Sequence, residues 1–263
     1  MSTVGRIAAR QAGDIVRSRW VLAYVAFFVV ATEGLLRFAG GDTRTLVSLA
    51  NVMLFVTPLV TIVFGAVYLY NAREFTELLL TQPISRPSVF AGLYLGLSAT
   101  LIGAWLAGVG LPLVLRGMLM TPDTGRAVLV LLLAGVALTA VFSALATLIA
   151  IRVDDRLKGL GMAIAVWLAL ALVYDGAVLI VVATFGDGPI EPVTLALMAL
   201  NPVDLARVAI LLQLDAAALL GYTGALFQRV FSGSGALLAA GALAIWIAAP
   251  LALASRAFKN KDF

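Results

Sequence analysis

Residues 127–151 read AVLVLLLAGVALTAVFSALATLIAI, a stretch in which no side chain carries a charge. About 20 apolar residues in a helix suffice to cross the roughly 30 Å hydrocarbon core of a bilayer. Helices of soluble domains are usually shorter, at about 10–14 residues. The stretch therefore predicts a membrane-spanning helix, and it decides how the rest of the chain is interpreted.

Five further apolar runs have a similar character. The predicted spans are residues 20–38, 46–70, 89–115, 127–151, 160–185 and 236–254. The sequence thus predicts an all-α integral membrane protein in which residues 20–263 form a single domain of six transmembrane helices.

The composition agrees with this class. Of the 263 residues, 62% are hydrophobic and 12% are charged, and the mean hydropathy is +1.07. Soluble domains are about 25% charged, so a soluble domain, a disordered chain and a nucleic-acid-binding protein are excluded. The chain has no Cys and no His, which removes thiolate chemistry and the commonest metal ligand and general base. We predict no metal site and no catalytic site on this chain.

The basic residues indicate the orientation. With six spans, both termini and the second and fourth loops share one side of the membrane, and 12 of the 18 basic residues lie there. They are Arg6, Arg10, Arg17, Arg19, Arg73, Arg86, Arg152, Arg156, Lys158, Arg256, Lys259 and Lys261. Cytoplasmic loops are enriched in Lys and Arg, so both termini are predicted to be cytoplasmic.

Residues 1–19 precede the first span and are predicted to form a cytoplasmic amphipathic helix. At about 100° per residue, one side of this helix collects most of the charges and the opposite side is apolar. The charged side holds Arg6, Arg10, Asp14 and Arg17, and the apolar side holds Val4, Ile7, Ala8 and Ile15. The pattern is typical of a helix at the membrane surface that faces anionic lipid. The alternative is an ordinary basic segment that only sets the topology.

Residues 186–235 between the last two spans are predicted to form short extracytoplasmic helices that lie at, or dip into, the outer membrane face. Asn201 suits a helix N-cap, Pro202 suits the first helical position, and Asp204 suits the positive first turn. These residues and Arg207 are the expected contact region for an outer partner. An extra pair of spans is the competing interpretation.

Two acidic residues fall inside predicted spans, where charges are costly and usually functional. Glu33 is expected to pair with Arg37, four residues further along the helix. Asp175 has no basic residue nearby in the sequence. It either faces an outward cavity, pairs with Arg207 or Arg37, or is protonated in the bundle.

The second loop, residues 71–88, reads NAREFTELLLTQPISRPS. Residues 71–82 are predicted to form a short helix that ends before Pro83. Glu74 and Glu77 lie on one face and point outward, and residues 78–80, all Leu, are expected to face the membrane. A helix this short needs a partner to be stable. The alternative is a solvated connector.

This loop resembles the one in permease subunits of ABC-2 type exporters. The similar residues are Glu77, Leu78, Leu79 and Leu80, then Pro83, Ile84, Ser85 and Arg86, then Gly92. The resemblance implies that the short helix is a coupling helix that docks into a separate ATPase subunit. The residues implied in docking are Arg73, Glu74, Phe75, Glu77, Leu78 and Arg86. The chain departs from the family in having Leu93 where Lys is frequent.

Two more stretches, residues 158–175 and 200–212, and the Arg19–Trp20 pair resemble NosY permeases. These belong to the ABC complex for copper-site maturation of nitrous oxide reductase. The resemblance implies a bacterial inner-membrane location, a second copy of the chain, a NosF-like ATPase that carries ATP and Mg²⁺, and a NosD-like periplasmic partner. No cofactor is implied on this chain, which has no P-loop motif of its own.

The loop around residues 152–158 offers a second contact for the ATPase, or is simply solvated. The residues concerned are Asp154, Asp155, Arg156 and Lys158. With Met as the only soft ligand type, a copper channel is disfavoured, which leaves export of another maturation substrate or transmission of motion to an outer partner. A general ABC-2 exporter of lipid, drug or polysaccharide is the first alternative function, and a membrane scaffold without an ATPase is the second.

Overall fold

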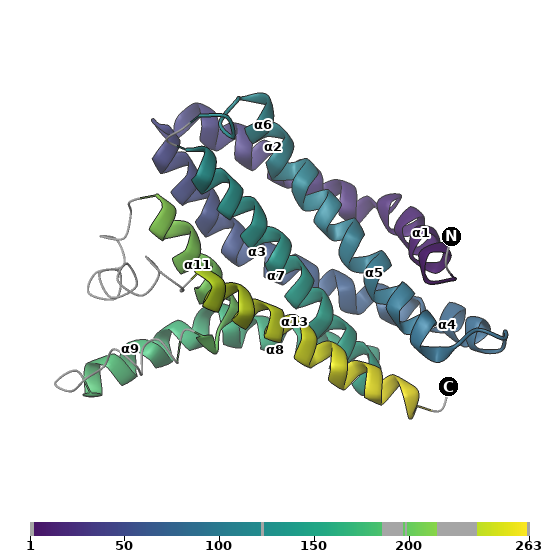
Figure 1. Cartoon of the computed structure of the whole chain (residues 1–263). Helices are drawn as coiled ribbons and strands as arrows, with labels where there is room; N and C mark the ends of the chain where they lie inside the picture. The colour runs from purple at the N-terminus through teal and green to yellow at the C-terminus, as the bar shows by residue number, and fades with distance from the viewer. Residues whose placement is uncertain (1–2, 122–123, 186–196, 198, 215–235, 262–263) are drawn as a thin grey trace.

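The computed structural model describes residues 3–121, 124–185, 197, 199–214 and 236–261, and its regular elements are all helical (Figure 1). The helices are α1 (Thr3–Val16), α2 (Arg19–Phe38), α3 (Asp42–Asn71), α4 (Arg73–Leu80), α5 (Arg86–Trp105), α6 (Leu111–Leu115), α7 (Gly125–Arg152), α8 (Arg156–Leu168), α9 (Tyr174–Phe185), α11 (Pro202–Gln213) and α13 (Ala236–Lys259). Two π-helical turns, η1 (Leu106–Gly110) and η2 (Ala169–Val173), join α5 to α6 and α8 to α9.

The predicted all-α membrane fold is confirmed. Six helices in the described part are long and apolar enough to cross a bilayer, and each coincides with a predicted span. They are Arg19–Phe38, Asp42–Asn71, Arg86–Leu115, Gly125–Arg152, Arg156–Ile180 and Ala239–Lys259. Residues 186–196, 198 and 215–235 of the predicted outer region lie outside the described residues. Within that region α11 is about 18 Å long at 1.5 Å per residue, which is too short to cross.

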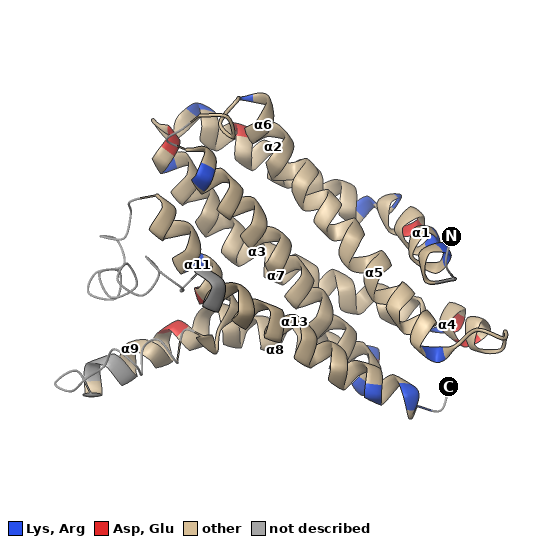
Figure 2. Cartoon of the chain, in the orientation of Figure 1, with Lys and Arg blue, Asp and Glu red and all other residues tan. Residues whose placement is uncertain are grey.

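Most charged residues lie toward the two ends of the bundle, and the helices between them carry few charges (Figure 2). Both chain termini lie at the same end, beside α1, α4 and the last turns of α13 (Figure 1). We call this end the basic end. An even number of spans requires this arrangement, because each span reverses the side on which the chain emerges.

The centre of the bundle is a junction of α2, α5 and α7 around one aromatic side chain. Trp105 is fully buried, and its ring lies edge-on to Phe28 with 5.1 Å between centroids. The indole fits flat against Gly135 of α7, where an added Cβ would lie only 2.1 Å from a ring carbon. Lipid tails are as apolar as the surfaces of the helices, so the hydrophobic effect does not drive helices together in a bilayer. Close packing at small residues holds them together instead.

Helix α1 is packed along α5 rather than standing free. Ile7 and Gln11 lie against Gly92 and Gly96, at positions where a Cβ would clash with them. Ile7 and Ile15 are buried, whereas the predicted charged side of the helix is exposed, so the expected division of its two faces is observed. Gln11 is buried on this side although its side chain is polar, and its amide oxygen accepts a hydrogen bond from Tyr68 of α3.

The π-helical turn η2 redirects the fifth span. Beyond it, α9 diverges from the neighbouring helices (Figure 1), and Leu179 and Ile180 are more than two-thirds exposed. This half of the span therefore offers an apolar surface to lipid or to another chain.

We predict that Gly135→Ala lowers the unfolding midpoint of the protein in detergent. The new methyl group would force the indole of Trp105 or the helix to move, and overpacking of this kind costs about 1–3 kcal/mol. Gly103→Ala is the matched control, because an added Cβ there would meet no neighbouring atom within 4 Å. It should leave the midpoint unchanged or raise it slightly, since Ala favours helix. Equal midpoints for both variants would contradict the proposed junction.

Candidate functional site

The residues of α4 fall on three faces when successive residues are placed 100° apart around the helix. Glu74, Glu77 and Leu78 lie on one face and line a common surface hollow with Leu80, Thr81 and Arg86. Phe75 and Leu79 lie on a second face, which is turned toward α1. Thr76 is buried on the third face, against the bundle. The expectation that residues 78–80 all face the membrane is wrong for Leu78, which shares the acidic face because it follows Glu74 by about one turn.

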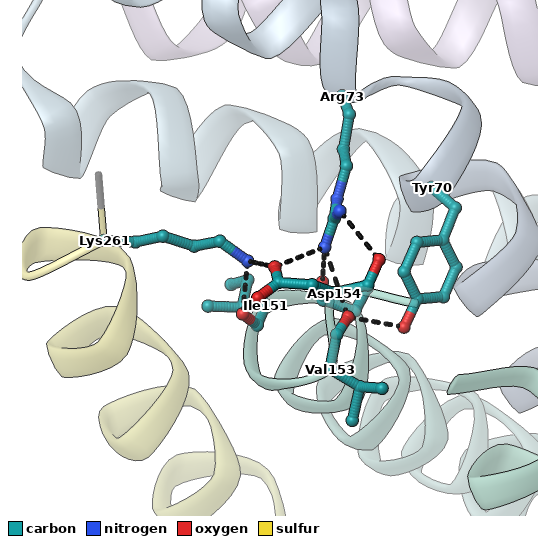
Figure 3. Close-up of polar contacts among 7 residues, drawn as sticks. Tyr70, Arg73, Ile151, Val153, Asp154 and Lys261 are labelled. Atoms are coloured by element: carbon teal, nitrogen blue, oxygen red, sulfur yellow. Dashed lines mark hydrogen bonds and ion pairs between the residues drawn. The ribbon is translucent and has the colours of Figure 1, made fainter. Parts of the chain in front are cut away.

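Arg73 opens α4 but points inward, away from the acidic face. Its guanidinium donates to the backbone carbonyls of Ala150, Val153 and Asp154 and pairs with the Asp154 carboxylate at 3.2 Å (Figure 3). It also lies over the ring of Tyr70, 5.1 Å from the centroid. Arg73 is thus engaged within the chain, where it joins the α3–α4 corner to the end of α7.

Lys261 joins the same cluster from the far end of the sequence. Its Nζ lies 2.6 Å from the Asp154 carboxylate and donates to the carbonyl of Ile151 (Figure 3). The hydrogen bond and charge of Lys261, together with the charge of Arg73, lower the pKa of the Asp154 carboxyl below its usual value. Asp154 is therefore ionised at neutral pH. We call Arg73, Asp154 and Lys261 the clasp, since they tie α4, α7 and the C-terminal segment together.

Tyr70 supports the clasp from α3. Its hydroxyl donates to the carbonyl of Val153 at 2.9 Å and lies against Gly159, where an added Cβ would stand 1.8 Å from the hydroxyl oxygen. The first turns of α8 are therefore held against the same corner.

The other predicted ATPase-contact residues divide in the same way between internal and exposed positions. Asp155 caps α8 by accepting the Lys158 N–H at 2.8 Å, and Arg86 donates to the carbonyls of Lys259 and Lys261. Both are engaged within the chain. Arg156 and Lys158 are exposed beside Leu157, which is 79% exposed.

The predicted N-cap of α11 is present and fully buried. The Oδ1 of Asn201 accepts the Val203 N–H at 3.0 Å, and its amide donates to the Leu170 carbonyl and to Asp204. Pro202 occupies the first helical position. Asn201 and Asp204 are almost inaccessible, so their side chains serve internal contacts and not an exposed partner surface.

Arg207 resolves the alternatives for Asp175. Its guanidinium lies 3.0 Å from the Asp175 carboxylate and 2.8 Å from that of Asp204. One arginine of α11 therefore bridges its own first turn and the start of α9. We call Asn201, Asp204, Arg207 and Asp175 the polar centre.

The polar centre lies deep in the bundle. Asn201 bonds to Leu170, which is about 21 Å along its helix from Arg156 at 1.5 Å per residue. Trp246 donates to the carbonyl of Ala199 at 3.2 Å and is about 20 Å from Lys259 by the same measure. Helix α11 thus begins well inside the bundle and does not merely touch an outer face.

Glu33 has two basic partners at the end of the bundle opposite the basic end. The predicted pair with Arg37 is present at 3.8 Å, but Arg116 is closer, at 2.8 Å. Sequence spacing could not find Arg116, because it lies 83 residues away. Among the described residues, no group of three or more acidic side chains is placed to hold a metal ion.

Comparison with known proteins gives consistent matches. A family model described as "ABC-2 family transporter protein" matches residues 6–263. The chain is 30% identical over 278 aligned positions to the "Probable ABC transporter permease protein NosY" of Pseudomonas aeruginosa, and the match covers 99% of each chain. A protein of the same description from Stutzerimonas stutzeri is 27% identical over 227 positions, covering 79% of this chain and 80% of the relative.

Loss of the central carboxylate should loosen the clasp. In Asp154→Asn we expect faster amide deuterium uptake in Arg73–Leu80 and in the turn before Lys261, with little change in the unfolding midpoint because exposed ion pairs contribute little to stability. The difference from wild type should persist below the usual pKa of an aspartic acid, because the lowered pKa keeps the Asp154 carboxyl ionised there, and it should vanish only at still lower pH, where that carboxyl protonates. Glu77→Gln is the control, since Glu77 pairs with no described residue. Unchanged uptake in Asp154→Asn would contradict the clasp.

Removal of the Arg207 cation from the polar centre should destabilise the protein more than the loss of the Asp154 carboxylate does. Arg207→Gln leaves the buried carboxylate of Asp204 without its cation, beside the partly exposed carboxylate of Asp175, and we expect a loss of about 1–3 kcal/mol, seen as a lower unfolding midpoint in detergent. Arg126→Gln changes the same charge at an exposed arginine of α7 and should have no such effect. If both variants unfold alike, Arg207 does not hold the centre.

Proposed function

The chain belongs to the ABC-2 transporter family and is the permease subunit of an ABC transporter, and we propose that it docks a separate ATPase through the acidic face of α4. ATP and Mg²⁺ belong to that ATPase subunit. The basic end is then cytoplasmic, in a bacterial inner membrane, which agrees with the excess of Lys and Arg there.

The observation that carries this proposal is the exposed face of α4. Leu78 is 64% exposed between two carboxylates that form no ion pair with the described residues. An isolated helix of eight residues is unstable in water, so a helix of this length depends on contacts with partners. A groove on the ATPase with an apolar floor and basic rims would match this face, because the floor would contact Leu78 and the rims would pair with Glu74 and Glu77.

The clasp explains how movement of α4 reaches the membrane. A single residue, Ala72, separates α4 from α3. Arg73 and Asp154 connect α4 to α7, and Lys261 extends the connection to the segment after α13. When the ATPase displaces α4, the ends of three spans therefore move together, which is the rigid-body type of transition that packed bundles support.

A second docking point is proposed at the start of α8. Leu157 is highly exposed between Arg156 and Lys158, so this point resembles the α4 face with the opposite charge. Two docking points of opposite sign favour one orientation of the partner, because the reversed orientation would bring like charges together.

A second copy of the chain is proposed to complete the transporter. The first, fifth and last spans are the least buried, with 22%, 17% and 17% of their most apolar windows buried, against 44–61% for the other three. The diverging helix α9 adds an unpartnered apolar surface. Each copy would dock one ATPase subunit, as ATP-driven closure of two ATPase subunits requires.

The similarity to two NosY permeases favours a role in copper-site assembly of nitrous oxide reductase, with a NosD-like periplasmic partner. Met118 and Met120, the paired soft ligands of the sequence, do not share an environment, since Met118 is buried and Met120 is 87% exposed. This favours transmission of motion, or movement of another maturation substrate, over passage of copper along this chain.

One observation favours the alternative of a general exporter. A largely apolar groove of about 700 Å³ lies between α7, α11 and α13, and a hydrophobic substrate of moderate size would fit it. The groove is lined by the fourth and sixth spans together with α11.

We predict that Glu74→Lys with Glu77→Lys abolishes co-purification of the ATPase from native membranes in mild detergent. Wild type should bring down a P-loop ATPase in near-equal amount, identified by mass spectrometry, and a secreted partner if the maturation role holds. Asp14→Lys with Asp42→Lys changes the net charge equally at exposed acids away from α4 and should keep the ATPase. An ATPase that stays bound to the α4 variant would refute docking at this face. Its absence from wild type would support a scaffold.

A further inference from the structure

A second cavity lies on the other side of α4. It has a volume of about 620 Å³, within the range of small-molecule sites, and separates α4 from α1. Its lining is Arg6, Ile7 and Arg10 of α1, Phe75 and Leu79 of α4, and Gln82, Pro83, Ile84, Ser85 and Ser88. We call it the α1–α4 pocket.

The charge of this pocket is strongly one-sided. Arg6 and Arg10 lie one helical turn apart, and no acidic residue is among the lining residues. Neither arginine forms an ion pair with a carboxylate of the described part. Arg10 also lies over the Phe75 ring, 5.8 Å from the centroid. Two unpaired guanidinium groups with neighbouring hydroxyl and amide donors suit a phosphate group.

The platform of the two arginines is rigid. Helix α1 is held against α5 by the contacts of Ile7 and Gln11 with Gly92 and Gly96, and Gln11 is tied to Tyr68. The arginines therefore project from a fixed backbone, and only their side chains have to be ordered when a ligand binds.

The pocket lies at the level of a membrane surface. Ser85 and Ser88 flank the first residues of the span Arg86–Leu115, so one wall of the pocket is where a span enters the bilayer. Ile7, Phe75 and Leu79 supply apolar surface beside the polar donors. Polar donors beside apolar side chains match a lipid headgroup and the glycerol region below it.

The ATPase does not compete for this pocket in the proposed arrangement. Phe75 and Leu79 are rotated by about 100–140° from Glu74 on the helix, and the docking face carries negative charge where the pocket carries positive charge. The two faces of α4 thus suit two different partners.

We propose that the α1–α4 pocket binds the phosphate headgroup of an anionic phospholipid, with Arg6 and Arg10 on the phosphate. Bound lipid forms a brace between α1 and α4 and fixes the position of the helix that docks the ATPase. The lipid site rests on the contacts of this chain alone. Only its effect on docking depends on the proposed function.

The test is lipid binding by the purified full chain in a neutral detergent, measured by native mass spectrometry. The probes are phosphatidylglycerol and phosphatidylcholine, with glycerol phosphate and inorganic phosphate as soluble competitors. Wild type should retain phosphatidylglycerol in preference to phosphatidylcholine at millimolar soluble phosphate. Arg6→Gln with Arg10→Gln should weaken retention at least about tenfold, the effect of losing one charge-assisted hydrogen bond or more.

Two further variants make the test specific. Arg17→Gln with Arg19→Gln removes the same charge from exposed arginines outside the pocket and should retain the lipid. Ser88→Asp places a negative charge in the pocket wall but in the first turn of α5, where an acid favours the helix, so it should fold and lose the lipid. Equal loss in both arginine pairs would reduce the site to a diffuse basic surface. Displacement by glycerol phosphate or inorganic phosphate, or equal binding of the two lipids, would overturn the anionic-lipid site. None of these outcomes depends on ATPase docking through Glu74 and Glu77.

Discussion

A charged group inside the hydrocarbon core of a bilayer has to find its partner within the protein, because no water is there to supply one. This requirement accounts for where the charges of this chain lie. Most are at the two ends of the bundle (Figure 2). The exception among the described residues is the polar centre. There Arg207 pairs with Asp175 and Asp204, while Asn201 accepts the N–H at the start of α11 and donates to a backbone carbonyl. A helix can begin deep inside the bundle only because its first turn is satisfied in this way.

The ion pairs at the basic end have a different role. Water is available there, so its ion pairs contribute little to stability. Their effect is to fix the positions of the segments that they join. Arg73 and Asp154 pair with each other and fix the corner between two loops, while the side chains of Glu74, Glu77 and Leu78 on the same helix remain exposed. A short helix with internal anchors on one face and exposed groups on another is suited to transmit a displacement from a partner into the spans.

Sequence reasoning succeeded where the signal is local. Runs of apolar residues gave the six spans, helix formers followed by Pro gave α4, and the Asn201–Pro202 pair gave the start of α11. It failed where the outcome depends on a distant residue. The inward turn of Arg73 needs Asp154, 81 residues away, and the closer partner of Glu33 is Arg116. Capping signals likewise state where a helix begins along the chain but carry no information about its depth in the membrane.

The two π-helical turns have a consequence for evolutionary comparison. A π-turn accommodates more residues per turn than the α-turn it replaces, so η1 and η2 are places where the chain can gain or lose one residue without breaking a span. A relative whose third or fifth span is straight would need a single gap there in an alignment. Without that gap, each position beyond the turn would be matched to one about 100° around the helix, and lipid-facing residues would be compared with buried ones.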